Sequence, residues 1–137
     1  MIKKFLFAIS FIALGFTTLY AENRAPFLIM DILPHMTMDI KKNWNNKELA
    51  LDEKQKAELL QIREETMAAV MDAKKKLAPL ETEVATKILS GSTPQEVENL
   101  VNEIAKYKVE ATKTHLNCVY KTQKVLSKKQ LEVLKNL

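Results

Sequence analysis

One thiol and two imidazoles are the side chains of this 137-residue chain best suited to bind a metal. Cys118 follows His115 by three residues, so in a helix the two side chains share nearly the same face. A thiolate and an imidazole at this spacing suit zinc, copper, nickel or cobalt, although one pair supplies only half of a metal site. From the other side of the chain, only His35 with Met36 and Met38 could complete such a site.

These residues also have structural interpretations. Cys118 lies on an apolar line, so a buried and inert thiol is the main alternative to a ligand or to a disulfide between two copies. Methionines are soft ligands for Cu(I), but in a helix they more often form core or an adaptable contact surface, and we favour that surface. Three consecutive lysines, at 74–76, favour a solvated patch near a helix C-terminus. The methionines in question are Met30, Met36, Met38, Met67 and Met71.

Catalysis is not expected from this sequence. It holds two histidines and one cysteine, and it lacks a glycine-rich loop. The pair of His115 and Cys118 has no third group beside it that would orient the imidazole, as a thiol enzyme requires. We therefore expect a protein that is not an enzyme.

The N-terminus predicts export. Lys3 and Lys4 precede an uncharged run from Phe5 to Leu19, which is the pattern of a secretory signal peptide. The run is too short to span a bilayer comfortably, so an uncleaved anchor is the weaker alternative. We expect cleavage between Ala21 and Glu22, a periplasmic location and no stable membrane anchor afterwards.

Charge is distributed unevenly along the rest of the chain. Without the two leader lysines, 19 basic residues face 17 acidic ones, which gives no strong bias towards nucleic acid. Residues 22–105 carry 11 basic and 15 acidic side chains, whereas residues 106–137 carry 8 basic and 2 acidic ones. The sequence thus predicts an acidic body with a basic C-terminal helix.

Three capping signals mark helix starts. In each, a short polar residue can cap the helix and the third helical residue can reach back to its amide. The pairs are Asp52 with Gln55, Thr93 with Glu96, and Ser127 with Gln130. With apolar residues at steps of three and four, they predict helices over 52–78, 80–90, 94–125 and 128 to the C-terminus, divided at Pro79. A short first helix is expected from His35 to Trp44.

These elements predict one all-α domain over residues 22–137. Its expected form is an antiparallel hairpin of long amphipathic helices with short flanking helices. Every seventh residue from Val97 to Val125 is apolar or Cys118, which predicts a coiled-coil-like seam along the last long helix. Such stripes bury little surface in isolation, so we expect a homodimer.

Two short segments resemble the Leu-Thr-x-x-Gln motifs of the Spy and CpxP family of periplasmic stress proteins. They run from Leu51 to Gln55 and from Leu126 to Gln130, and their order and separation also fit that family. Asp52 and Ser127 replace the usual threonine, and both are good caps. The resemblance extends from residue 51 to 137, and only loosely before it. It implies a helical hairpin that dimerises into a curved cradle and holds unfolding clients without ATP.

Some relatives in this family, of the CnrX and ZraP kind, bind metals. The CnrX-like pattern implies a metal-binding His eight residues before the leucine of the second motif, and Cys118 occupies that position here. The same pattern implies two His four residues apart before the first motif, where this chain has Lys42 and Asn46. The candidate metal ligands are therefore His115, Cys118, His35 and Met36.

The sequence thus favours an ATP-independent periplasmic chaperone, or envelope-stress protein, that binds unfolded or partly folded clients. Its methionine-rich helices offer an adaptable surface, and its basic final third would attract acidic clients. The alternative is a periplasmic heavy-metal sensor or resistance protein that binds zinc, copper, nickel or cobalt.

Overall fold

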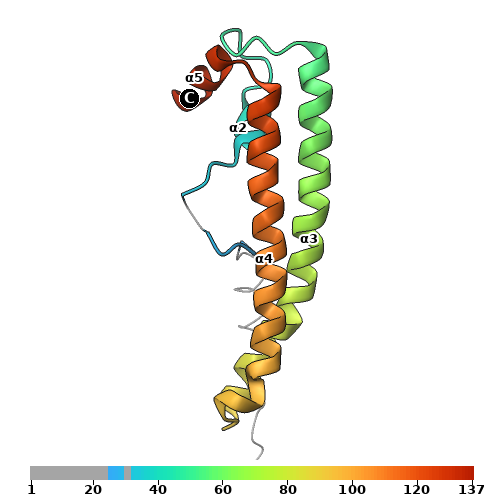
Figure 1. Cartoon of the computed structure of the whole chain (residues 1–137), viewed down its shortest axis with the longest axis vertical. Coiled ribbons are helices and arrows are strands. Elements are labelled where there is room, and N and C mark those ends of the chain that lie inside the picture. The colour runs from blue at the N-terminus through green and yellow to red at the C-terminus, as the bar shows by residue number, and fades with distance from the viewer. Residues whose placement is uncertain (1–24, 30–31) are drawn as a thin grey trace, which may run out of the picture.

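The computed structural model describes residues 25–29 and 32–137, so the expected signal peptide, its cleavage site and Met30 lie outside the described residues. Within these ranges the chain is all-helical and contains no strand, as the sequence predicts (Figure 1). No helix there is long and apolar enough to cross a membrane. The helices are α2 (Met36–Lys42), α3 (Glu53–Leu89), α4 (Pro94–Val125) and α5 (Lys128–Lys135).

Helix α3 is continuous, so the predicted division at Pro79 into helices over 52–78 and 80–90 is wrong. Pro79 lies inside the helix. An interior proline costs about 3 kcal/mol through its missing donor and its ring clash. Tertiary contacts on both sides offset this cost, because Leu77 is buried and Glu81 pairs with Lys108 of α4 at 2.7 Å.

The expected helix starts are present. Asp52 accepts a hydrogen bond from the Gln55 amide at 2.7 Å, and the Gln55 side chain accepts one from the Asp52 amide at 3.2 Å. At the start of α4, the Glu96 carboxylate accepts a hydrogen bond from the Thr93 amide at 2.6 Å. These local interactions begin the helices where the sequence places them, whereas α2 stops at Lys42, two residues short of the expected end.

The two long helices pack side by side along most of their lengths (Figure 1). The buried side of α4 includes Val97, Ala111 and Cys118, three members of the predicted sevenfold line. On α3, the spacing of apolar residues at steps of three and four predicts a buried Ala69, but Ala69 is exposed and Val70 is buried. Val70 stands eleven residues after buried Leu59 and seven before buried Leu77, both close to a whole number of helical turns, so these three side chains share one side of the helix.

Part of the basic charge of α4 is neutralised inside the fold. Besides the pair of Lys108 with Glu81, Lys121 lies 3.5 Å from Glu65 of α3. The acidic body and the basic C-terminal third are therefore partly charge partners of each other. Only the remaining cations are available to attract other molecules.

The two Leu-x-x-x-Gln segments meet at one end of the helix pair. The Gln55 side-chain amide donates to the Val125 carbonyl and to Gln130 Oε1, both at 2.9 Å. Gln130 donates to the Leu49 carbonyl at 3.0 Å and to Gln55 Oε1 at 3.0 Å, and it accepts from the Ser127 amide at 2.9 Å. The glutamines thus cap their own helices and also join α3 to α5.

A buried apolar cluster lies beside this amide pair and includes the leucine of the second motif. Its buried members are Met36, Ile40, Leu49, Leu59 and Leu126. Leu51, the leucine of the first motif, packs against them from a half-buried position. We call the amide pair together with this cluster the glutamine end of the molecule.

Candidate functional site

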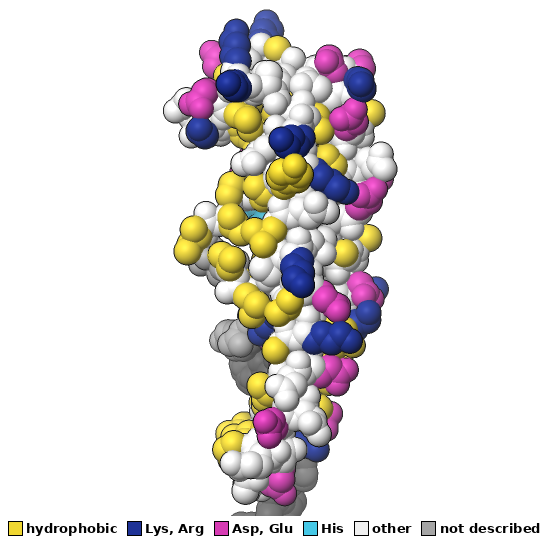
Figure 2. Space-filling model, in the orientation of Figure 1, with side chains coloured by type: hydrophobic (Ala, Val, Ile, Leu, Met, Phe, Trp, Pro, Cys, Tyr) yellow, Lys and Arg dark blue, Asp and Glu magenta, His cyan; other side chains and the backbone are white. Residues whose placement is uncertain are grey.

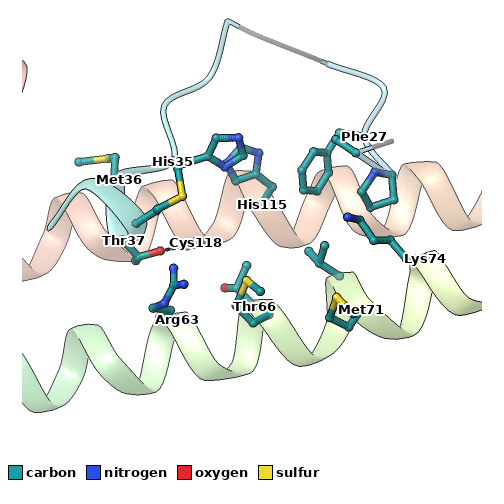
Figure 3. A pocket seen from close by; sticks show the side chains of 15 residues that line it. Phe27, His35, Met36, Thr37, Arg63, Thr66, Met71, Lys74, His115 and Cys118 are labelled. Atoms are coloured by element: carbon teal, nitrogen blue, oxygen red, sulfur yellow. Dashed lines mark hydrogen bonds between the residues drawn. The ribbon is translucent and has the colours of Figure 1, made fainter. Parts of the chain in front are cut away.

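A pocket of about 270 Å³ lies on the α2 side of α3 and α4 (Figure 3). The short segment before α2, the start of α2 itself and both long helices contribute to its walls. We call it the methionine pocket. Its lining residues are Ala25, Pro26, Phe27, His35, Met36, Thr37, Met38, Arg63, Thr66, Met67, Val70, Met71, Lys74, His115 and Cys118.

Two imidazoles stack on each other in this pocket. The ring centroids of His35 and His115 are 4.9 Å apart, with ring planes inclined by 17°. The ring of Phe27 stacks on His115 at 4.8 Å. A hydrogen bond from the Leu28 amide to Thr112 Oγ1, at 2.8 Å, holds this part of the chain on α4. The stack and this hydrogen bond therefore fasten the segment before α2 to α4.

One atom of this stack lacks a hydrogen-bond partner. His115 is 5% exposed, and its Nε2 is buried with no partner among the described residues. Burial lowers the pKa of His115 because it penalises the charged form, and nearby His35 lowers it further, while the Pro34 backbone acts in the opposite direction. His115 is therefore a neutral imidazole with an unsatisfied nitrogen at neutral pH. The other such atom in the described ranges is Thr122 Oγ1, also on α4.

Cys118 is a buried free thiol, 5% exposed. Its Sγ lies 3.9 Å from Thr37 Oγ1 of α2, within reach of a weak hydrogen bond (Figure 3). This position agrees with the structural interpretation of the apolar line. A disulfide between two copies would require the pocket to open, because the sulfur is shielded from solvent.

The methionines of the pocket differ in exposure. Met36 is 6% exposed and belongs to the glutamine end as well, whereas Met38, Met67 and Met71 are each between 38% and 46% exposed. Flexible thioether side chains at half-exposed positions can rearrange around varied apolar groups. The structure thus places these three methionines at the surface and not in tightly packed core.

Two cations line the pocket from α3. Arg63 and Lys74 are half-buried, and in the described ranges neither forms an ion pair with a carboxylate. No Asp or Glu of the described residues lines the pocket. Lys74 was expected in a solvated lysine patch, but only its neighbours fit that description: Lys75 is exposed, and Lys76 pairs with Asp72 at 2.6 Å. The pocket is therefore apolar with a positive charge.

The geometry can be compared with what a metal needs. All four residues singled out as ligands, His35, Met36, His115 and Cys118, line this one pocket. However, no three His, Cys, Asp or Glu side chains of the described residues are grouped closely enough to hold a metal ion. A metal binds in the plane of an imidazole, so the stacked rings could share one ion only if one ring rotated.

The sequence analysis did not place Arg63, Lys74 or Phe27 in a binding site. A signal for the cations was present, because Arg63, Met67, Met71 and Lys74 follow one another at steps of four, four and three and so share a face of α3. Phe27 could not be placed from the sequence, because its segment has no periodic pattern that would dock it on α4.

Around the pocket, the molecule exposes apolar side chains. Figure 2 shows them gathered on the face where α2 and the preceding segment cover the long helices, with histidine visible in the hollow between them. Leu28, Ile29 and Ile32 are 56%, 40% and 83% exposed. A concentration of exposed apolar groups on one face is typical of an interaction site.

The chain matches no family model, no curated protein and no solved structure.

Proposed function

We propose that this chain is an ATP-independent periplasmic chaperone that holds unfolded or partly folded clients in the methionine pocket and on the apolar face around it. The observation that carries the proposal is the pocket itself, whose walls combine half-exposed methionines with two cations that have no acidic partner among the described residues. Thioethers adapt to varied apolar groups, and a periplasmic chaperone must act through binding alone because that compartment has no ATP.

The proposal includes an antiparallel hairpin of α3 and α4 that pairs with a second copy into a cradle. The contacts between the helices support the hairpin, because Glu65 pairs with Lys121 and the later Glu81 with the earlier Lys108. Exposed apolar side chains far from the pocket, such as Leu89 at 85% and Val101 at 47%, support a partner copy. Light scattering at micromolar concentration should give the mass of a dimer, and a strict monomer would contradict it.

The test of client binding is suppression of aggregation. A reduced or heat-stressed protein of unrelated sequence is mixed with stoichiometric amounts of the mature chain in the presence of a chelator. Protection that weakens as salt is raised is the expected result, because salt screens the attraction between the pocket cations and the client. No protection at any salt concentration would contradict the proposal.

Substitution of methionines that line the pocket should reduce protection in the same aggregation assay. We expect the double variant Met67→Ser and Met71→Ser to lose most of the protection, because it replaces adaptable apolar surface with polar groups. Met38 lies on α2 across the pocket and remains in that variant. The matched control is Leu60→Ser, since Leu60 is also about 40% exposed on α3 but does not line the pocket. Equal losses in the two variants would point to general surface hydrophobicity.

Metal binding is the second candidate, and one observation favours it. Every cysteine, histidine and methionine of the described residues lines the methionine pocket. Thiolate, thioether and imidazole together suit soft ions such as Cu(I). The pocket lining has no carboxylate within the described residues, and its two cations repel the doubly charged ions of zinc, nickel and cobalt more strongly than Cu(I). Calorimetry with each ion, on the mature chain and on Cys118→Ser, tests this function. Stoichiometric binding that the variant abolishes, with client protection absent unless metal is added, would favour the metal protein over the chaperone.

A further inference from the structure

The two cations of the methionine pocket stand at its opposite ends. Arg63 and Lys74 both belong to α3, and Figure 3 shows their side chains directed into the space between α3 and α4. Each lies beside apolar groups and, in the described ranges, has no carboxylate partner. A half-buried cation beside apolar surface gains from an anion brought by another molecule.

The distance between the two cations along α3 sets the length of a ligand that could contact both of them. Lys74 follows Arg63 by 11 residues, which is close to three helical turns, so both lie on one face of the helix. At 1.5 Å per residue the two positions are about 16 Å apart. An extended peptide advances about 3.3 Å per residue, so about five residues cover that distance.

The surface between the cations is apolar. Met67, Val70 and Met71 lie between them on α3, while Phe27 lines the pocket from the segment before α2 and Met36 from the start of α2. Because the lining lacks Asp and Glu within the described residues, the charge of the pocket has one sign. An acidic group at either end is attracted, and a basic group is repelled.

We propose that the methionine pocket binds an extended, apolar client segment that carries an acidic residue at each end, with the acidic residues about five positions apart. The inference rests on the proposed chaperone function and names the kind of segment that is held. Arg63 can bind one carboxylate through two parallel hydrogen bonds, and Lys74 binds the other as a point charge. The methionines between them accommodate the apolar side chains of the segment.

The experiment measures the affinity of blocked synthetic peptides for the mature, full chain by calorimetry. Three peptides share a core of apolar residues and carry aspartate, asparagine or lysine at both ends. The aspartate peptide should bind about tenfold more tightly than the asparagine peptide, and the lysine peptide should bind most weakly. Added salt should bring the three affinities closer together.

Substitutions of the two cations test whether they cause the preference for the aspartate peptide. Arg63→Gln and Lys74→Gln should each weaken the aspartate peptide several-fold, and the double variant should bind the aspartate and asparagine peptides equally. Lys75→Gln is the matched control, because Lys75 is exposed beside Lys74 on α3 and does not line the pocket. Helical content by circular dichroism, measured on each variant, excludes loss of the fold as the cause.

Several results would overturn the inference. Equal binding of the aspartate and asparagine peptides is one, and a loss in Lys75→Gln as large as that in Lys74→Gln is another. Tighter binding of dodecanoate than of any peptide would assign the pocket to an acyl carboxylate instead. If the mature chain still suppresses aggregation, these results leave the chaperone function intact. Absence of both peptide binding and protection would remove the function itself.

Discussion

The glutamine end and the methionine pocket are adjacent in the same fold and differ in how fully their polar groups are satisfied. At the glutamine end, the side chains of Gln55 and Gln130 bond to each other and to the backbone of three segments. In the pocket, His115 Nε2 has no partner among the described residues, and Arg63 and Lys74 have no counter-charge there.

The difference indicates where stability and function lie. Buried groups that are fully hydrogen-bonded specify one arrangement, and removing one partner carries the cost of the group left behind. Unsatisfied polar groups beside adaptable apolar side chains contribute little to stability and remain available for a ligand. Substitutions at the glutamine end should therefore unfold the protein, whereas substitutions in the pocket should change what it binds.

The largest effect is expected from Leu59→Ala. Leu59 is 1% exposed within the apolar cluster of the glutamine end. Its truncation should lower the free energy of unfolding by about 3 kcal/mol, from lost burial and the cavity left behind. Met71→Ala, in the pocket and 46% exposed, should cost less than about 1 kcal/mol. Urea denaturation of both variants checks the contrast, and equal costs would contradict it.

Gln130→Ala should cost somewhat less, about 2 kcal/mol, because it leaves the Leu49 carbonyl without its donor and removes one of the two acceptors of the Gln55 side-chain amide. The control is Gln123→Ala on the exposed side of α4, which should change stability by at most about 0.5 kcal/mol. Denaturation of both variants measures the difference. If Gln130→Ala is as mild as its control, the amide pair does not stabilise the fold.

His115→Leu changes a buried residue of the methionine pocket and, unlike the substitutions at the glutamine end, should not lower the free energy of unfolding appreciably. The substitution removes a buried nitrogen that has no partner among the described residues, and it keeps an apolar side chain beside Phe27. We expect the free energy of unfolding to stay within about 1 kcal/mol of the original value, or to rise. Thermal and urea denaturation at neutral pH measure it. A loss comparable to that of Gln130→Ala would mean that the imidazole stack is a structural core.

The smallest expected effect is the dependence of the free energy of unfolding on pH. The pKa of His115 is lowered in the folded state, so between the folded and unfolded pKa values the unfolded chain binds more protons. The stability that comes from the neutral imidazole is therefore fully present above the unfolded pKa, about 6.5, and is lost as the pH falls through and below it. Denaturation from pH 7.5 to pH 5 should show this loss, and His115→Leu should show a shallower one. Identical slopes would contradict the assignment.

Local interactions account for most of what the sequence predicted correctly. Capping by Asp52 and Ser127 depends on residues three positions away, so the starts of α3 and α5 follow from the chain itself. Helical periodicity likewise placed Cys118 on the buried side of α4. At Pro79 the local rule failed, because contacts between α3 and α4 outweighed the cost of the missing donor.

What the sequence by itself determined is therefore the set of helices, their starts and the face of α4 that is buried, since each depends on residues within a few turns of one another. The tertiary structure alone decided that Gln55 bonds to Gln130, that Phe27 and His35 stack with His115, and that two cations stand in an apolar pocket without acidic partners in the described ranges. These contacts join residues far apart in the chain, and no local spacing encodes them. Packing of the segment before α2 onto α3 and α4 created the pocket in which they meet.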